Sequence, residues 1–239
     1  MAVKKIVTNI NNKSYNFDIS YDIVNPKNVD VLVFLHGWGS NKNIMKQAFS
    51  TQCSNMKHIY VDMPGFGNST NQYELTTKDY AKILDLFFKE LKIVPKIIAG
   101  HSFGGKVATL LQPKLLVLLS TAGIIEKKST NVKIKIKLAK FLNSLGLNNI
   151  TKIFRSNDVE NMSENMYVTF KNVVDEDFSE IFRNYNKPTK IFWGKNDTAT
   201  SLTSGKTINK LIKNSEFKSY DGDHYFFLKH AKDIAQCIC

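Results

Sequence analysis

At the centre of the sequence stands the hexapeptide Gly100-His101-Ser102-Phe103-Gly104-Gly105. An apolar run that ends at Ala99 precedes it, and residues 106–111 after it have a helical pattern. A strand, a sharp turn and a helix around Gly-x-Ser-x-Gly are typical of a serine nucleophile. Because the turn is tight, the positions two before and two after the serine must be small, as Gly100 and Gly104 are. Ser102 would then lie at a helix N-terminus, where backbone N–H groups can stabilise a developing oxyanion.

The same residues also fit the Gly-x-x-x-x-Gly-Lys pattern of phosphate-binding loops, which would end at Lys106. That loop requires a Ser or Thr as the next residue, to bind Mg²⁺, and this chain has Val107 there. A second trace of the motif, Gly205-Lys206-Thr207, has Thr200 in place of its first glycine. Nucleotide binding is therefore disfavoured.

An acid and a histidine follow Ser102 in the chain order that such a nucleophile requires. Asp197 comes just after the apolar segment Thr189 to Trp193, and His224 comes just after Glu216 to Tyr220. Both stand at the carboxyl ends of predicted strands, where an open α/β sheet builds its site. Taken singly, Asp197 would be a turn or capping residue and His224 a loop residue. Together they predict a triad in which His224 is the base and Asp197 orients it.

A fourth element, His36-Gly37-Trp38-Gly39, directly follows a predicted strand. Its two glycines allow the backbone to turn back toward the nucleophile. We expect the N–H groups of Trp38 and Phe103 to form an oxyanion hole. His36 is then expected to hold the loop rather than to act on the substrate.

The remaining pattern predicts an α/β fold, with a mainly parallel, doubly wound sheet and helices on both faces. A hairpin of Val3 to Ile10 and Tyr15 to Val24 is expected first, with Asn11-Asn12 as its turn. A helix is expected to begin at Thr77 or at Lys78-Asp79 and to run to Leu91. Further strands are predicted in four apolar segments: Val29 to Leu35, His58 to Val61, Lys96 to Ala99 and Leu115 to Ser120.

One long insertion interrupts the alternation of strands and helices, and it divides the chain into two parts. Residues 1–122 and 188–239 are predicted to form the core, and residues 123–187 a helical cap over the site. Three helical faces are expected in the cap, one from Ile134 to Leu145, in which a strand over residues 132–138 is the alternative. The other two are centred on Phe170 and on Phe182.

These motifs, with Asp62-Met63-Pro64-Gly65-Phe66-Gly67-Asn68-Ser69 and Trp193-Gly194-Lys195-Asn196-Asp197, resemble the α/β-hydrolase superfamily. The resemblance covers nearly the whole chain, and the cap is the variable part. It implies the α/β-hydrolase fold and the same triad. Ser102 argues against haloalkane dehalogenases and epoxide hydrolases on this fold, which use an aspartate nucleophile.

Within the superfamily, the chain resembles small bacterial carboxylesterases, including those that demethylate an acyl ester bound to a carrier protein. It also resembles meta-cleavage-product hydrolases, which cleave C–C bonds in 2-hydroxy-6-oxo-dienoates. In those, Asn precedes the nucleophile and Trp follows the histidine, whereas this chain has His101 and Tyr225. Their cap arginine, which holds a substrate carboxylate, could correspond to Arg155 or Arg183. Tyr225, Arg155 and Arg183 are therefore the candidate substrate contacts.

Composition bounds the remaining possibilities. The 239 residues include 43% hydrophobic and 23% charged residues, and no apolar run is long enough for a signal peptide or a membrane span. Three cysteines, Cys53, Cys237 and Cys239, without metal-ligand spacing predict reduced thiols and a cytoplasmic protein. The net charge of +12 fits either a solvated lysine-rich surface, which we favour, or an acidic partner such as a carrier protein. No nucleic-acid motif is present.

Three functions remain open at this point. The first is hydrolysis of a carboxylic ester or thioester with a small-molecule acyl group through an acyl-enzyme, with neither a metal nor an organic cofactor. The second is C–C bond hydrolysis of the meta-cleavage type. The third is a slow-turnover ligand-binding protein on the same fold.

Overall fold

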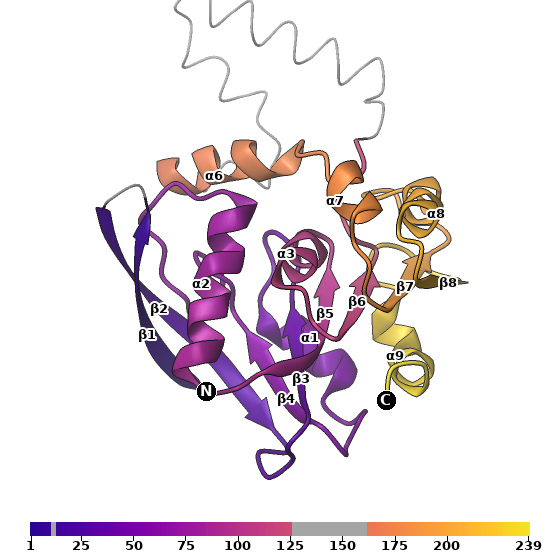
Figure 1. Cartoon of the computed structure of the whole chain (residues 1–239), viewed down its shortest axis with the longest axis horizontal. Helices are drawn as coiled ribbons and strands as arrows, with labels where there is room; N and C mark the ends of the chain where they lie inside the picture. The colour runs from indigo at the N-terminus through magenta and orange to yellow at the C-terminus, as the bar shows by residue number, and fades with distance from the viewer. Residues whose placement is uncertain (11–12, 126–161) are drawn as a thin grey trace, which may run out of the picture.

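The computed structural model describes residues 1–10, 13–125 and 162–239. Its centre is an eight-stranded sheet in the order β1-β2-β4-β3-β5-β6-β7-β8 (Figure 1). The strands are β1 (Ala2–Ile10), β2 (Lys13–Val24), β3 (Val31–Leu35), β4 (Lys57–Val61), β5 (Pro95–His101), β6 (Leu115–Leu119), β7 (Thr189–Gly194) and β8 (Ser215–Tyr220).

The sheet is parallel from β4 to β8, as predicted. β1 and β2 form the expected antiparallel hairpin at one edge, with Ala2 opposite Tyr21, and β2 pairs antiparallel with β4. The hairpin turn at residues 11–12 lies outside the described residues. β3 begins at Val31 rather than at Val29, whose side chain is exposed to solvent.

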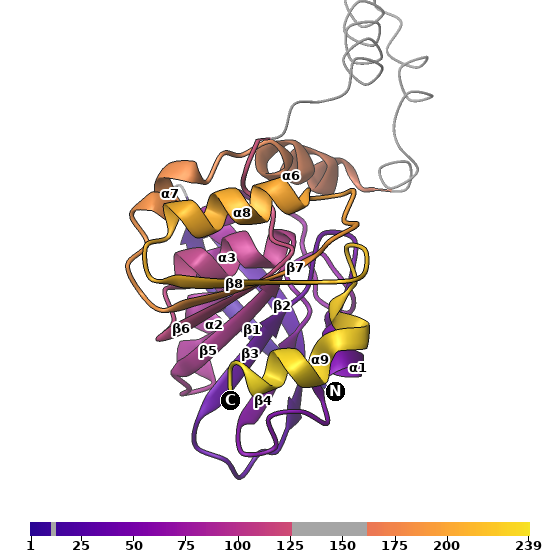
Figure 2. The ribbon, with the colours of Figure 1, turned by 90° about the vertical axis from the view of Figure 1, so that its right-hand side faces the viewer.

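Alternate residues of β3 enter two separate apolar cores, because successive side chains of a strand point to opposite faces of the sheet. Val31, Val33 and Leu35 pack with the face covered by α2 (Thr77–Glu90), α3 (Phe103–Leu111) and α8 (Leu202–Leu211). Leu32 and Phe34 pack with the other face, covered by α1 (Lys42–Phe49) and α9 (Phe227–Gln236). Figure 2 shows these layers on either side of the sheet. Both faces are covered, which explains the uninterrupted apolar sequence of β3.

The predicted helix at residues 77–91 is present as α2, and hydrogen bonds at Thr76 explain why it begins at Thr77. The Thr76 side chain accepts a hydrogen bond from the N–H of Asp79, and the Asp79 carboxylate accepts one from the N–H of Thr76. This reciprocal capping box satisfies two N–H groups that the helix cannot pair internally.

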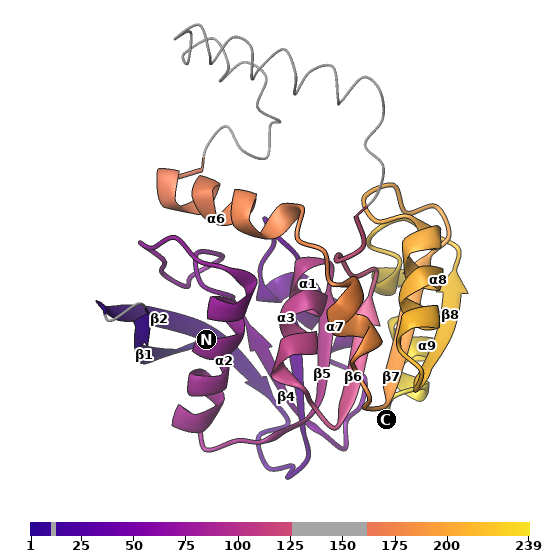
Figure 3. The same ribbon diagram turned by 45° about the horizontal axis from the view of Figure 1, so that its top comes forward.

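The segment between β6 and β7 contributes two described helices, α6 (Glu164–Val174) and α7 (Ser179–Arg183). α6 lies across one end of the molecule above α2 (Figure 3), and Thr169 accepts a hydrogen bond from the N–H of Leu75 at 3.0 Å. Phe178 and Phe182 are fully buried in the same core as α2 and α3. The helix predicted at Ile134 to Leu145 lies outside the described residues.

The expectation of three reduced thiols is wrong for two of them. Cys53 and Cys239 form a disulfide with their Cα atoms 5.7 Å apart, and Cys237 is free. The two residues are 186 positions apart in sequence. They meet because α9, which ends near the C-terminus, packs beside α1 on the same face of the sheet. Among the described residues, no helix is long and apolar enough to cross a membrane.

Candidate active site

Ser102 lies between the end of β5 at His101 and the start of α3 at Phe103, with φ 51° and ψ −117°. This backbone conformation is rare for a residue with a side chain and marks a strained turn. The two flanking glycines are required by space, because a Cβ atom on Gly100 would collide with the carbonyl group of Gly104. One on Gly104 would lie only 2.5 Å from the carbonyl oxygen of His36. The sharp turn expected at Ser102 is therefore present.

Asp197 and His224 are brought together by the loops after β7 and β8. His224 Nδ1 lies 2.8 Å from Asp197 Oδ2, and the Asp197 side chain is fully buried. Oδ1 of Asp197 also accepts the N–H groups of Ala199 at 2.8 Å and Thr200 at 2.9 Å. Burial alone would raise the pKa of Asp197, but the hydrogen bonds from His224 and Thr200 lower it to about 2. Asp197 is thus ionised, so Nδ1 of His224 carries a proton and Nε2 is left as the acceptor.

His101 joins the Ser102 turn to the His224 loop. Its Nε2–H donates to the backbone oxygen of His224 at 3.0 Å, and the two rings lie 4.5 Å apart between centroids. Burial, with the neighbouring His224, lowers the pKa of His101 to about 3, so the ring is neutral. Within the residues that the structure describes, no hydrogen bond joins Ser102 to His224.

The loop after β3 passes directly against the Ser102 turn. A Cβ atom added to Gly37 would lie 3.1 Å from the Cβ atom of Ser102. His36 Nδ1 lies 2.7 Å from the oxygen of Gly37, and His36 Nε2 accepts the N–H of Met63 at 3.0 Å. Since Nε2 accepts, Nδ1 must donate. Burial lowers the pKa of His36 to about 4, which keeps this neutral form.

The hydrogen bond from His36 also fixes the direction of the Trp38 N–H. The Gly37 oxygen and the Trp38 N–H belong to one planar trans peptide unit, in which they point in opposite directions. Holding the oxygen on the His36 side therefore aims the N–H of Trp38 to the other side. His36 is in this way a positioning residue for the expected oxyanion-hole donor.

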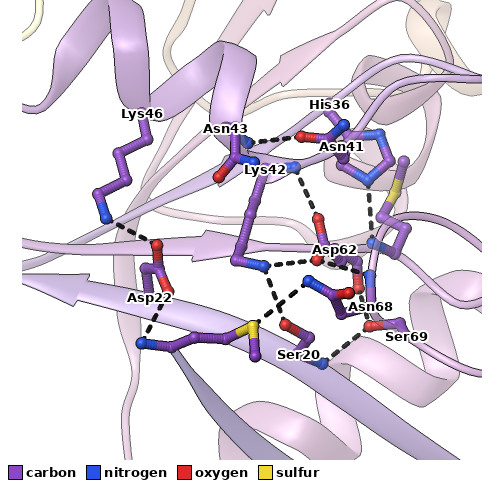
Figure 4. Close-up of polar contacts among 12 residues, drawn as sticks. Ser20, Asp22, His36, Asn41, Lys42, Asn43, Lys46, Asp62, Asn68 and Ser69 are labelled. Atoms are coloured by element: carbon purple, nitrogen blue, oxygen red, sulfur yellow. Dashed lines mark hydrogen bonds and ion pairs between the residues drawn. The ribbon is translucent and has the colours of Figure 1, made fainter.

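A buried ion pair fixes the start of α1, which directly follows the His36 loop (Figure 4). Lys42 Nζ lies 2.6 Å from Asp62 Oδ2 and also donates to Ser20 Oγ at 2.9 Å. The Asp62 carboxylate accepts the backbone N–H of Lys42 at 2.7 Å and that of Asn68 at 3.0 Å. Asp62 thereby ties the start of α1, which directly follows the His36 loop in sequence, to the loop after β4, where the N–H of Met63 donates to His36.

A cavity of about 460 Å³ opens beside Ser102. Trp38 and Phe103, the two expected oxyanion residues, form part of its wall. Thr198, Ala199 and Thr200, which directly follow Asp197, form another part. The geometry therefore combines a nucleophile turn, an acid–histidine pair and a loop with directed N–H groups beside one cavity. Within the described ranges, no three His, Cys, Asp or Glu side chains are grouped as metal ligands.

None of the predicted substrate contacts that the structure describes lines this cavity. Arg183 is 52% exposed and pairs with Glu180 on its own helix, and it does not line the cavity beside Ser102. Arg155 lies outside the described residues. Tyr225 is 40% exposed, with its ring 5.3 Å from that of His101, and it too does not line the cavity.

The ion pair between Lys106 and Glu176 lies near the site and was not predicted from the sequence. Lys106, which fits the phosphate-loop pattern, is 1% exposed, and its Nζ lies 3.1 Å from Glu176 Oε2. Glu176 lines the cavity. The available signal was a lysine in a stretch of small and apolar residues, Gly104 to Ala108, which leaves its charge in need of a buried partner.

Comparison with known proteins supports a common family. A sequence model described as "Alpha/beta hydrolase family" matches residues 32–178. Over 232 residues, the chain is 26% identical to "Putative esterase/lipase 2" of Mycoplasma pneumoniae, covering 81% of this chain and 83% of that protein. It is 36% identical over 78 residues to the pimeloyl-(acyl-carrier protein) methyl ester esterase of Vibrio campbellii. This second match covers 33% of the chain and 29% of that esterase.

Solved structures share the fold. The esterase EaEST from Exiguobacterium antarcticum superposes with a TM-score of 0.73, over 93% of this chain and 94% of that one. The two sequences are 18% identical, so this likeness concerns the fold alone.

Proposed function

This chain belongs to the alpha/beta hydrolase family and is a hydrolase, and we propose that it cleaves carboxylic esters or thioesters through an acyl-enzyme formed on Ser102. The observation that carries this proposal is the 2.8 Å bond between His224 and a buried, ionised Asp197, at the sheet end where Ser102 occupies its strained turn. The proposed catalytic residues are Ser102, His224 and Asp197.

In the first step, Nε2 of His224 takes the proton of the Ser102 hydroxyl while Oγ attacks the carbonyl carbon of the substrate. The carbonyl π electrons move to the oxygen and form an oxyanion. Asp197 stays ionised, holds Nδ1–H in place and stabilises the imidazolium. His224 then gives its proton to the departing alcohol or thiol as the tetrahedral intermediate collapses.

The N–H groups of Trp38 and Phe103 are the proposed donors to the oxyanion. Phe103 opens α3, so its N–H is among those that a helix leaves without an internal partner. The backbone N–H of Trp38 is oriented by the hydrogen bond from His36 Nδ1 to the oxygen of Gly37. Donors fixed before the reaction stabilise the developing charge without reorganising, which lowers the barrier.

In the second step, water replaces the departed alcohol. His224 removes a proton from the water as its oxygen attacks the acyl carbon, and Ser102 leaves with that proton restored through His224. The products are a carboxylic acid and the free enzyme. The chain's own residues supply each proton transfer.

We also propose a helical cap and a macromolecular carrier for the substrate. α6 contributes Phe170 and Val173 to the cavity wall, which supports residues 123–187 as a cap on a core of residues 1–122 and 188–239. The match to a pimeloyl-(acyl-carrier protein) methyl ester esterase, together with the net charge of +12, supports an acyl group carried by an acidic carrier protein. Esters on such a carrier should then be cleaved faster than the free methyl ester, and added salt should reduce the difference.

Hydrolysis of p-nitrophenyl esters of increasing acyl length tests the proposal, with a dienoate ring-fission product run in parallel. Wild type should cleave esters faster than the dienoate, and Ser102→Ala should abolish turnover. Ser204→Ala is the matched control, because Ser204 lines the same cavity but is not one of the proposed catalytic residues. Turnover by Ser102→Ala within tenfold of wild type would contradict the nucleophile assignment. Faster cleavage of the dienoate would indicate C–C hydrolysis, and saturable ester binding without turnover would indicate a binding protein.

A further inference from the structure

His224 is bonded to the protein through both its side chain and its backbone. Its Nδ1 lies 2.8 Å from Asp197 Oδ2, and its backbone oxygen accepts the Nε2–H of His101 at 3.0 Å. The first bond orients the imidazole ring, and the second fixes the backbone from which the ring extends. The position of Nε2 of His224, which must take the proton of Ser102, therefore depends on both bonds.

His101 is also the residue directly before the proposed nucleophile. It ends β5 and is 1% exposed, and Ser102 follows it with its left-handed φ of 51°. One peptide unit thus separates Ser102 from the residue whose side chain holds His224. A shift of the nucleophile turn would be passed to the backbone of His224 through this side chain.

Packing holds the His101 ring in place. Its centroid lies 4.5 Å from that of His224, 5.3 Å from that of Tyr225 and 4.8 Å from that of Phe227. Phe227 is fully buried and opens α9. A Cβ atom added to Gly37 would lie 3.0 Å from Nδ1 of His101, so the loop after β3 also lies against this ring. A buried ring with neighbours on these elements presents its N–H in one direction.

The loops after β7 and β8, which carry the acid and the base, are bonded to each other. The N–H of Asn196 donates to the backbone oxygen of Gly222 at 2.9 Å. A Cβ atom on Gly194 would collide with the backbone oxygen of Asp223, so the two loops are also in close contact. The bond from His101 connects these two loops to the nucleophile turn.

The His101 ring holds the base without opposing its charge. Burial, with the neighbouring His224, lowers the pKa of His101 to about 3, so the ring is uncharged at neutral pH. A positive ring at a centroid distance of 4.5 Å would disfavour the charge that His224 gains when it takes the Ser102 proton. The neutral ring supplies the hydrogen bond alone.

We propose that His101 is a positioning residue for the base, and that its bond to the backbone of His224 sets the distance between Nε2 of His224 and Oγ of Ser102. This inference rests on the proposed ester hydrolysis at Ser102. Proton transfer requires these two atoms to come within hydrogen-bonding distance in the complex with substrate. A displacement of about 1 Å can lower the rate about 10²-fold, so the loss of this bond should reduce kcat.

Two variants of nearly equal side-chain length separate the hydrogen bond from the bulk of the ring. His101→Gln can place an amide N–H near the position of Nε2 and should keep kcat within about fivefold of wild type, whereas His101→Met has no donor and should lower kcat about 10²-fold. KM should change less than about threefold in both, because His101 does not line the cavity beside Ser102. His101→Asn serves if His101→Met is unstable, because its shorter amide reaches the position of Nδ1 instead of Nε2.

His58→Met is the matched control. His58 is also fully buried, and its Nε2 also bonds a backbone oxygen, that of Cys53, at 3.0 Å, but it does not line the cavity. This variant should keep the kcat of wild type even if its free energy of unfolding, measured by urea denaturation, falls as much as that of His101→Met. A similar fall in kcat would show that the loss of any buried histidine has this effect, and would overturn the inference.

Amide hydrogen exchange separates the inference from the proposed hydrolysis, because it requires no turnover. The peptide that spans residues 221–227 should exchange at least about threefold faster in His101→Met than in wild type and in His101→Gln. This result in a protein that cleaves no ester would contradict only the hydrolysis and would support the anchoring of His224. Equal exchange in the three proteins, or equal kcat in His101→Gln and His101→Met, would overturn the inference.

Discussion

Nζ of Lys42 lies 2.6 Å from Oδ2 of Asp62, and the two side chains are 3% and 1% exposed. Such a pair is costly to desolvate, and it is strongly destabilising to remove one partner because the other charge is left buried. Lys42 opens α1 directly after the His36 loop, and Asp62 directly follows β4 and precedes Met63, whose N–H donates to His36. The pair therefore holds together the segment that follows the His36 loop and the segment that bonds it. This buried contact links the stability of the fold to the geometry of the proposed oxyanion hole.

Lys42→Met should therefore lower the free energy of unfolding by about 3 kcal/mol, measured by urea denaturation. Lys46→Met is the matched control one turn further along α1. Lys46 pairs with Asp22 at 2.7 Å but is 41% exposed, so its loss should cost less than about 1 kcal/mol. If both variants lowered the free energy of unfolding by the same amount, burial of the Lys42–Asp62 pair would not explain the effect.

His36 should influence the rate through Trp38. His36→Gln loses the group at the Nδ1 position that holds Gly37, so kcat should fall by about 10²-fold with little change in KM, as for loss of an oxyanion donor. His36→Asn can place its amide N–H near that position and should recover most of kcat. His58→Gln is the control, because His58 is also buried but bonds Tyr60 and Cys53, away from the cavity. If Asn and Gln at position 36 give the same kcat, the peptide-plane role of His36 is wrong.

Stability should fall in mild acid because of buried neutral histidines. Burial lowers the pKa of His36 from 6.5 to about 4, so below pH 6.5 the unfolded chain binds a proton that the folded chain does not. The free energy of unfolding contributed by this group is then fully present above pH 6.5 and is lost as the pH falls toward 4. The slope approaches about 1.4 kcal/mol per pH unit for each such histidine.

Urea denaturation at several pH values between 6.5 and 4 measures this dependence for wild type and His36→Asn. The variant should lose stability less steeply over this window, because one proton-linked group is gone. His101, whose pKa burial lowers to about 3, keeps its own contribution in both proteins. Identical slopes would contradict a neutral, buried His36.

The structure contains one free thiol and one disulfide among the three cysteines. Iodoacetamide applied to the denatured, unreduced protein should add one label, on Cys237, and three labels after reduction. Reduction should also lower the free energy of unfolding by about 2–4 kcal/mol, since the bond constrains the unfolded chain over a long loop. Intact-mass measurement checks the labels. Three labels before reduction would show that Cys53 and Cys239 are not joined.

The sharp turn at Ser102 and the pairing of Asp197 with His224 could be predicted because their signals are local. The glycines around Ser102 are dictated by collisions within a few residues, and Asp197 and His224 each follow an apolar strand directly. In a parallel sheet, the carboxyl ends of neighbouring strands meet at one edge, so position in the chain predicts position in space. The same reasoning correctly predicted the order of the core elements and the start of α2.

The contacts that the sequence could not predict all join distant positions. Lys106 and Glu176 are 70 residues apart, and Cys53 and Cys239 are 186 apart. No spacing rule connects such pairs, because they depend on how helices pack over the sheet. Arg183 shows the converse case, since its partner Glu180 lies three residues away on the same helix, and Arg183 does not line the cavity beside Ser102.

The proposed nucleophile is tested most directly by labelling with a fluorophosphonate probe, followed by peptide mass spectrometry to locate the adduct. Oγ of Ser102 should displace fluoride from phosphorus and carry the label, and prior incubation with a good ester substrate should slow the reaction. A protein that hydrolyses esters while Ser102 stays unlabelled, or that carries the label on another residue, would contradict the proposed role of Ser102.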